Sequence, residues 1–101
     1  NACSWRSRPG SQRVQIDLLI DRKDETVNLC EMKFSRSEYE IDSDEEQKIL
    51  RRLDVFQNET GTSKSIILTM VTTSGLKRNS HSDIIQSVIT IDDLFAPPFV
   101  L

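Results

Sequence analysis

The sequence predicts a small α/β domain in which a β-hairpin, a crossover helix, a buried strand and a final strand form one mixed sheet. Two β-rich runs, residues 14–21 and 27–34, flank a short charged loop, which is typical of a hairpin. Residues 43–56 then repeat apolar side chains at helical spacing. The apolar run at 65–72 follows, and such a run is typical of a strand that is covered on both faces. A crossover helix between such strands favours parallel pairing.

Length and composition indicate one soluble globular domain. The chain has 101 residues, 37% hydrophobic and 29% charged, and its apolar runs are too short to span a bilayer. Its two cysteines are too few for a disulfide framework or a four-cysteine metal site, so we expect reduced thiols and a cytoplasmic protein. The net charge of −3 argues against a constitutive nucleic-acid coat but not against a site that itself needs carboxylates.

The domain is expected to occupy residues 14–96. Residues 1–13 are rich in Ser, Arg and Pro and are interpreted as an N-terminal tail or loop, although Trp5 is expected to pack. Residues 97–101, which begin with Pro-Pro, are interpreted as a C-terminal tail. The chain starts without Met and without a signal-peptide core, so we expect a fragment of a longer protein.

The helix is expected to begin near Ser43. Ser43 and Glu46 have the spacing of a capping box, and Gly61 provides a stop signal. The expected core face of the helix consists of Ile49, Leu50, Leu53 and Phe56. Beyond the buried strand, a last strand is expected at 88–91 and a helical turn at 92–95.

The hairpin is the most informative part of the chain, because each of its strands carries charge on one face. Alternation puts Asp17 on one face of its strand with Gln15, Leu19 and Asp21, opposite Ile16, Leu18 and Ile20. It also puts Glu31 and Lys33 on one face of the next strand. In an antiparallel hairpin, the numbers of directly opposed residues have a constant sum. A turn of odd length allows a sum of 48, which opposes Asp17 to Glu31, or of 50, which opposes Asp17 to Lys33, and either register brings these three side chains together. A two-residue turn gives 49 and opposes Asp17 to Met32, so we predict the odd turn.

Two carboxylates and a lysine in this arrangement suit metal-assisted hydrolysis. Asp17 and Glu31 offer hard oxygen ligands for Mg²⁺ or Mn²⁺, and the backbone carbonyl of Met32 could add a third. The ammonium of Lys33 could orient a metal-bound water and offset developing charge.

These residues resemble the D…(D/E)-X-K core of the PD-(D/E)XK nucleases. Asp17 precedes Glu31-Met32-Lys33 by fourteen residues, and the surrounding IDLLIDRKDETVNLCEMKFS is similar to the C-terminal segment of bacterial AAA-type ATPases that carry a nuclease-like domain. The likeness runs from Trp5-Arg6 to the segment IDDLF at 91–95 and implies a restriction-endonuclease-like fold.

The resemblance also implies a function. It implies metal-dependent cleavage of DNA, with Asp17 and Glu31 as metal ligands, Lys33 as the catalytic lysine, and Gln47 or Lys48 near the substrate. It further implies an ATPase domain in the same full-length protein. This sequence departs from the pattern: Gln15-Ile16 replaces the proline of the motif, and no phosphate-binding Gly-rich loop occurs. The helix that precedes the core in the family is missing here or lies upstream of Asn1.

Other interpretations stay open from the residues alone. Asp21 is a rival carboxylate, interpreted as a rim residue or a partner of Arg22 or Lys23. His81 is interpreted as a surface residue. The chain could be a nuclease-like domain that only binds DNA or a protein partner, or a dimerisation module that associates through residues 66–71.

Overall fold

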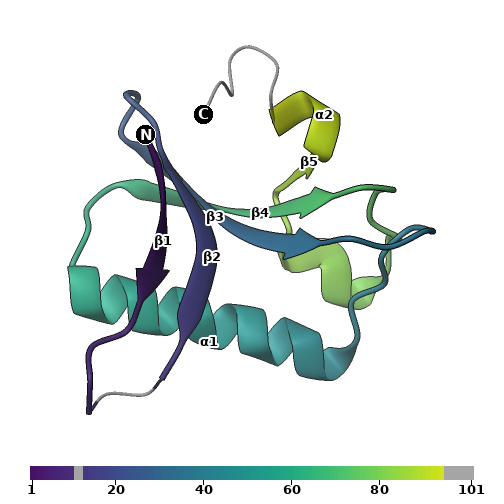
Figure 1. Cartoon of the computed structure of the whole chain (residues 1–101). Helices are drawn as coiled ribbons and strands as arrows, with labels where there is room; N and C mark the ends of the chain where they lie inside the picture. The colour runs from purple at the N-terminus through teal and green to yellow at the C-terminus, as the bar shows by residue number, and fades with distance from the viewer. Residues whose placement is uncertain (11–12, 95–101) are drawn as a thin grey trace.

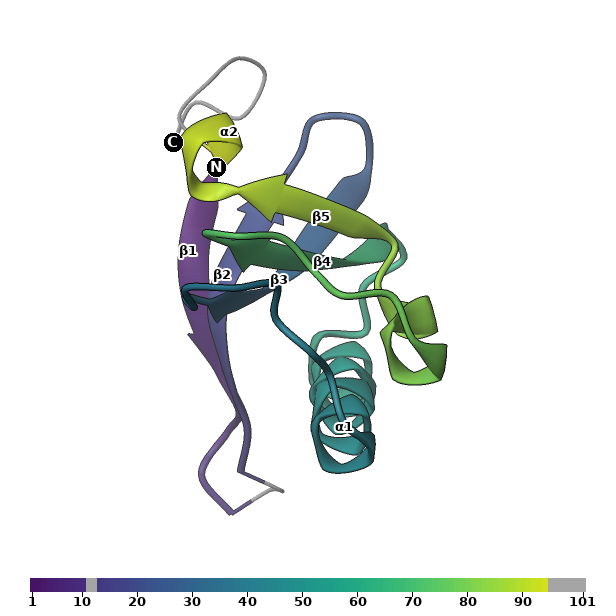
Figure 2. The same ribbon diagram turned by 90° about the vertical axis from the view of Figure 1, so that its right-hand side faces the viewer.

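The computed structural model describes residues 1–10 and 13–94, which form one five-stranded sheet with a long helix on one face. The sheet order is β1-β2-β3-β4-β5, and Figures 1 and 2 show the helix α1 running beneath it. The elements are β1 (Ala2–Arg6), β2 (Gln15–Asp21), β3 (Thr26–Lys33), α1 (Ser43–Thr60), β4 (Ser65–Thr72), η1 (Ser80–Ile84), β5 (Ser87–Thr90) and α2 (Ile91–Leu94).

The sheet is mixed, as the sequence predicts. β1, β2 and β3 pair antiparallel, and after the crossover through α1 the chain returns to pair β4 parallel with β3. β5 adds a second parallel pair. The predicted hairpin, crossover helix, buried strand and final strand are therefore all present. The predicted helical turn at 92–95 corresponds to α2 (Ile91–Leu94), while Phe95 and the predicted tail at 97–101 lie outside the described residues.

The prediction of a tail or loop over residues 1–13 is wrong for residues 2–6, which form the edge strand β1. Ala2 pairs with Ile20 and Arg6 with Gln15. Trp5 packs as expected, with its ring edge-on to Phe56 of α1 at a centroid distance of 5.2 Å. This long-range contact compensates for the weak strand pattern of the segment.

The turn of the β2–β3 hairpin has the predicted odd length. The backbone N–H of Arg22 donates to the carbonyl of Thr26, so three residues, 23–25, form the loop. Glu25 adopts a positive φ of 64°, as the last residue of a three-residue hairpin loop commonly does. The opposed pairs, from Leu18–Cys30 to Asp21–Val27, all sum to 48, one of the two predicted registers.

The simple alternation expected along β2 is wrong at its start. Between the pairs Cys3–Leu19 and Trp5–Ile16 the register shifts by one residue, so β2 carries a bulge at Asp17 and Leu18. Ile16 and Leu19 consequently share the core cluster beneath the sheet, whereas Leu18 and Ile20 belong to the cluster on the opposite face.

The helix α1 begins at Ser43, but its cap differs from the prediction. Asp42 is the N-cap residue, and its carboxylate accepts a hydrogen bond of 2.8 Å from the backbone N–H of Glu45. Gly61 ends the helix with a φ of 58°, as predicted for a stop signal. Ile49 and Phe56 are buried and Leu53 packs against the same core, but Leu50 is 41% exposed, so its predicted place in the core is wrong.

The strand β4 is an interior strand of the sheet, between β3 and β5. Its residues 68–71 are buried in the two core clusters or between them, which leaves this part of the predicted dimerisation segment no surface for a second copy. Over residues 1–10 and 13–94, no helix has the length and apolar character needed to cross a membrane.

Candidate functional site

The candidate site lies where β2 and β3 separate. Their ladder ends at the pair Leu18–Cys30, whereas β3 continues alongside β4 to the pair Lys33–Thr72. Figure 1 shows the two strands diverging beyond this point, with α1 passing beneath them. Asp17 immediately precedes Leu18, in the bulge of β2 at the mouth of this divergence.

Glu31 is a buried carboxylate surrounded by positive charge. It is only 5% exposed, yet its Oε1 accepts a hydrogen bond of 2.7 Å from the Arg52 guanidinium of α1. The ammonium of Lys33 lies 3.9 Å from the same oxygen. A buried carboxylate needs such partners, because its desolvation costs several kcal/mol.

Lys33 is fixed by two further residues that precede or begin α1. Its Nζ lies 3.0 Å from Oε1 of Glu45 and 5.5 Å from the ring centroid of Tyr39, within the range of a cation–π contact. The hydroxyl of Tyr39 donates to Glu45 at 2.6 Å. The backbone of Tyr39 is in turn held by hydrogen bonds with Gly75 and Lys77 in the loop after β4.

The electrostatics of these groups follow from burial and from their partners. Burial raises the pKa of Glu31, and the nearby charges of Arg52 and Lys33 oppose this shift without cancelling it. Burial also acts to raise the pKa of Glu45, but the hydrogen bonds from Tyr39 and Lys33 outweigh it and the pKa lies below the ordinary value. Burial and the bond to Glu45 raise the pKa of Tyr39. The site therefore holds Tyr39 as a neutral donor.

The structure brings Glu31 and Lys33 together on the face of β3 that looks toward α1. Asp17 is exposed and lies in the bulge of β2, near enough for its charge to contribute to the raised pKa of Glu31. The described part of the chain holds no group of three or more His, Cys, Asp or Glu side chains positioned for a metal ion. The oxygen donors around the centre are the carboxylates of Asp17, Glu31 and Glu45, together with backbone carbonyls such as that of Met32.

The other predicted site residues lie around this centre. The side chain of Met32 packs in the cluster on the far face of the sheet, so only its backbone could serve the site. Gln47 and Lys48 are exposed on α1 and line a shallow depression together with Asp44 and Arg51. At about 100° per residue, this stripe flanks the face that carries Glu45 and Arg52.

Asp21 and His81 lie away from the centre. The carboxylate of Asp21 pairs with Lys64 at 2.7 Å, which confirms the rim interpretation but not the expected partners Arg22 and Lys23. His81 connects η1 to α1 through Glu46, 2.7 Å from its Nδ1. Cys30 is a fully buried free thiol, and burial raises its pKa to about 12, so we expect it to be unreactive.

Sequence reasoning missed the helix residues that hold the site, Glu45 and Arg52. A signal for them exists: their spacing from Ile49 and Phe56 puts both charges on the apolar face of an amphipathic helix. Charged residues on such a face need buried partners, and the opposing strand supplies Glu31 and Lys33.

Comparison of the chain with models of known protein families, with curated proteins and with solved structures finds no match.

Proposed function

We propose that this chain is a Mg²⁺- or Mn²⁺-dependent DNA nuclease domain, the C-terminal part of a larger protein that carries an ATPase module. The observation that carries the proposal is the position of the Lys33 ammonium, 3.9 Å from the Glu31 carboxylate, with Asp17 near enough for its charge to raise the pKa of Glu31. Together with the sequence resemblance to PD-(D/E)XK nucleases, this gives each residue of the motif a role.

The donor set fits a divalent ion of this type. Mg²⁺ keeps several of its waters and commonly takes only one or two carboxylates besides substrate phosphate oxygens. Asp17 and Glu31 would hold the ion with the backbone carbonyl of Met32, and Arg52 would have to release Oε1 of Glu31. When bound, such an ion polarises phosphate oxygens and lowers the pKa of a bound water.

The chain's own residues supply the rest of the chemistry. Lys33 is kept in place by Glu45 and Tyr39, so its ammonium can orient the attacking water and offset negative charge that develops on the phosphate. Arg52, once released from Glu31, would be available to neutralise a phosphate oxygen. Gln47 and Lys48, exposed on the flank of α1, are positioned for contacts with the DNA backbone.

Cleavage of a labelled DNA duplex by the purified chain with Mg²⁺ or Mn²⁺ tests the proposal. Lys33→Ala is expected to lower the cleavage rate about a hundredfold or more. Lys23→Ala is the matched control, because Lys23 is an exposed lysine in the far turn of the same hairpin and its loss should leave the rate unchanged. Metal-dependent cleavage at the native rate by the Lys33→Ala variant would overturn the assignment.

A second candidate is a nuclease-like domain that binds DNA or a protein partner without cleaving it. The observation that favours it is the ion pair of 2.7 Å between Arg52 and Glu31, which occupies an oxygen that a metal ion would need. Calorimetric titration with Mn²⁺ separates the two functions. Binding that disappears in Asp17→Ala supports the nuclease, whereas a native chain that takes up no Mn²⁺ supports the binding domain.

A further inference from the structure

We propose that the end of the β1–β2 hairpin is a basic arm, made of Arg6, Arg13 and Gln15, that binds the phosphate backbone of duplex DNA outside the cleavage site. The inference rests on the proposed function, because it names how the same substrate is held. It assigns the arm to binding alone, independent of metal and of cleavage.

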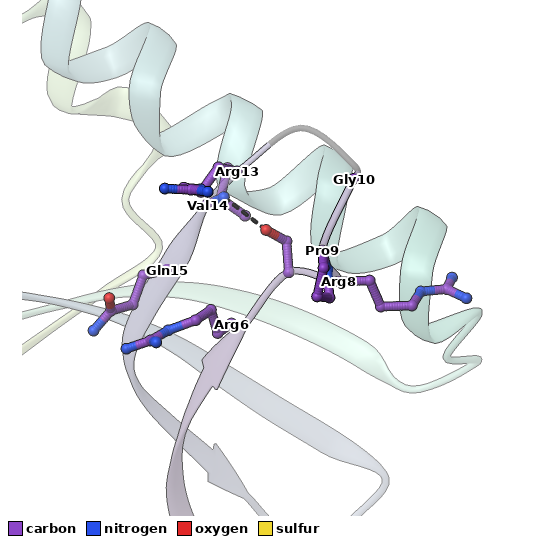
Figure 3. A pocket seen from close by; sticks show the side chains of 8 residues that line it. Arg6, Arg8, Pro9, Gly10, Arg13, Val14 and Gln15 are labelled. Carbon is purple, nitrogen blue, oxygen red and sulfur yellow. Dashed lines mark hydrogen bonds between the residues drawn. The ribbon is translucent and has the colours of Figure 1, made fainter.

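The pairing of the two strands places these side chains together. Arg6 and Gln15 are direct cross-strand partners, and Arg13 lies two residues before Gln15, on the same face of an extended chain. Figure 3 shows the side chains of Arg6, Arg13 and Gln15 extending to one side of the hairpin. All three are exposed, and they line one hollow with neighbouring residues of the β1–β2 connection.

The described residues that flank the β1–β2 connection are anchored by hydrogen bonds and an ion pair. Ser7 and Val14 are buried, and two hydrogen bonds join them: the backbone N–H of Ser7 donates to the carbonyl of Val14, and the N–H of Val14 donates to Oγ of Ser7. On the side toward α1, Arg8 contacts Glu59 through its backbone N–H and its guanidinium. Arg8 therefore fastens the arm to the helix while the other two arginines face solvent.

The charge of the arm contrasts with the rest of the chain. Residues 6–16 contain three arginines and no acid, within a chain whose net charge is −3. Excess positive charge on one exposed ribbon of an acidic protein selects a polyanion, and the planar donor fork of Arg matches phosphate oxygens. A two-stranded ribbon is also narrow enough to follow a DNA groove.

The position of the arm relative to the candidate site favours DNA. Gln15 lies two residues before Asp17 on β2, about 7 Å along the strand. Arg6 and Gln15 alternate with Trp5 and Ile16, which pack toward α1, so a duplex held at Asp17 would reach the arm around the end of the hairpin. Lys48 and Arg51 line a depression on α1 and would add a second group of cationic contacts.

Binding of a short fluorescent duplex, measured by anisotropy in EDTA over a range of salt concentrations, tests the arm without cleavage. Each lost phosphate contact removes about 0.9 from the slope of log affinity against log salt. The double variant Arg6→Gln/Arg13→Gln is therefore expected to lose about 1.8 of this slope. Its loss of affinity between about 50 and about 200 mM salt should be about tenfold smaller than that of the native chain.

Lys23→Gln/Arg78→Gln is the matched control, because it removes the same charge from exposed positions elsewhere and should keep the native slope. An equal change of slope in both double variants, or native binding without salt dependence, would overturn the inference. The outcome is separable from that of the proposed function. If the chain cleaves no DNA but needs Arg6 and Arg13 to bind it, the inference about the arm holds and the proposed nuclease function fails. If the chain cleaves DNA and its binding does not depend on these two arginines, the proposed function holds and the inference about the arm fails.

Discussion

At the scale of single residues, the site depends on whether the carboxyl group of Glu31 is protonated. Its burial disfavours the carboxylate form, while Arg52 at 2.7 Å and Lys33 at 3.9 Å favour it. Burial outweighs the two cations, and the pKa lies above the ordinary value of 4.5. A protonated Glu31 cannot ligate a metal ion, so protons should compete with the metal at a higher pH than they would for an exposed glutamate.

Substituting Arg52 tests this balance directly. Arg52→Met keeps most of the side-chain volume but removes the largest charge that lowers the pKa of Glu31, so the pKa is expected to rise further. The measurement is an NMR titration of the Glu31 carboxyl carbon against pH. The native inflection should lie above 4.5, and that of Arg52→Met higher still.

Arg51→Met is the control for this titration, because Arg51 is exposed on the flank of α1 and should leave the inflection where it is. A native inflection at or below the ordinary glutamate value would contradict the prediction. It would mean that the two cations outweigh burial.

At the scale of elements, α1 positions half of the site from its first three turns. Glu45 holds Lys33, and Arg52 holds Glu31, so the helix must start at the correct residue for both contacts to form. The start is fixed by Asp42, whose extended backbone and side chain satisfy the N–H of Glu45. Ser43, although a good capping residue by type, is already inside the helix.

Replacing these two neighbours should separate the true cap from the residue that only resembles one. Asp42→Ala removes the hydrogen bond to Glu45 and is expected to lower the free energy of unfolding by about 1 kcal/mol. Ser43→Ala should change it little, because alanine is favourable inside a helix. Urea denaturation of both variants provides the measurement. Equal losses in the two would indicate that Asp42 does not cap the helix.

At this scale, the sequence could predict the features that depend on the local pattern of residues. The odd hairpin turn followed from the requirement that charged residues share a face, and the strand at 65–72 has the predicted bounds. The edge strand β1 was missed because its sequence, ACSWR, lacks apolar alternation. It forms through pairing with β2 and through the packing of Trp5 on Phe56, contacts that no local window contains.

The candidate site was predictable to the same extent. Glu31 and Lys33 lie on one strand at a spacing of two, so alternation alone brings them together. Asp17 is harder, because the bulge of β2 interrupts alternation at that residue. The partnership of Arg52 with Glu31 depends on the packing of α1 against the sheet, which the residues of neither element specify alone.

At the scale of the whole molecule, the site combines side chains from three elements. Asp17 belongs to β2, Glu31 and Lys33 to β3, and Arg52 to α1. β2 and β3 separate at this point, and the charge of Asp17 acts on Glu31 near the opening between them. A divalent ion held by both carboxylates would join the two strands and stabilise the folded chain.

Metal binding should therefore be measurable as stability. A ligand that binds only the folded state stabilises it by about 2.7 kcal/mol at a hundred times its Kd, which for a domain of this size raises the unfolding temperature by roughly 10 °C. We expect Mn²⁺ to produce such a shift in the native chain and EDTA to remove it. Asp17→Ala should lose the shift.

Asp21→Ala should keep the shift, because Asp21 lies on the same strand but pairs with Lys64 at the far end of the hairpin. The comparison distinguishes a specific site from general binding of cations to an acidic protein, which would weaken equally in both variants. A shift that survives in Asp17→Ala and in Glu31→Gln would place the metal elsewhere. Glu31 would then stay paired with Arg52, as the non-catalytic alternative requires.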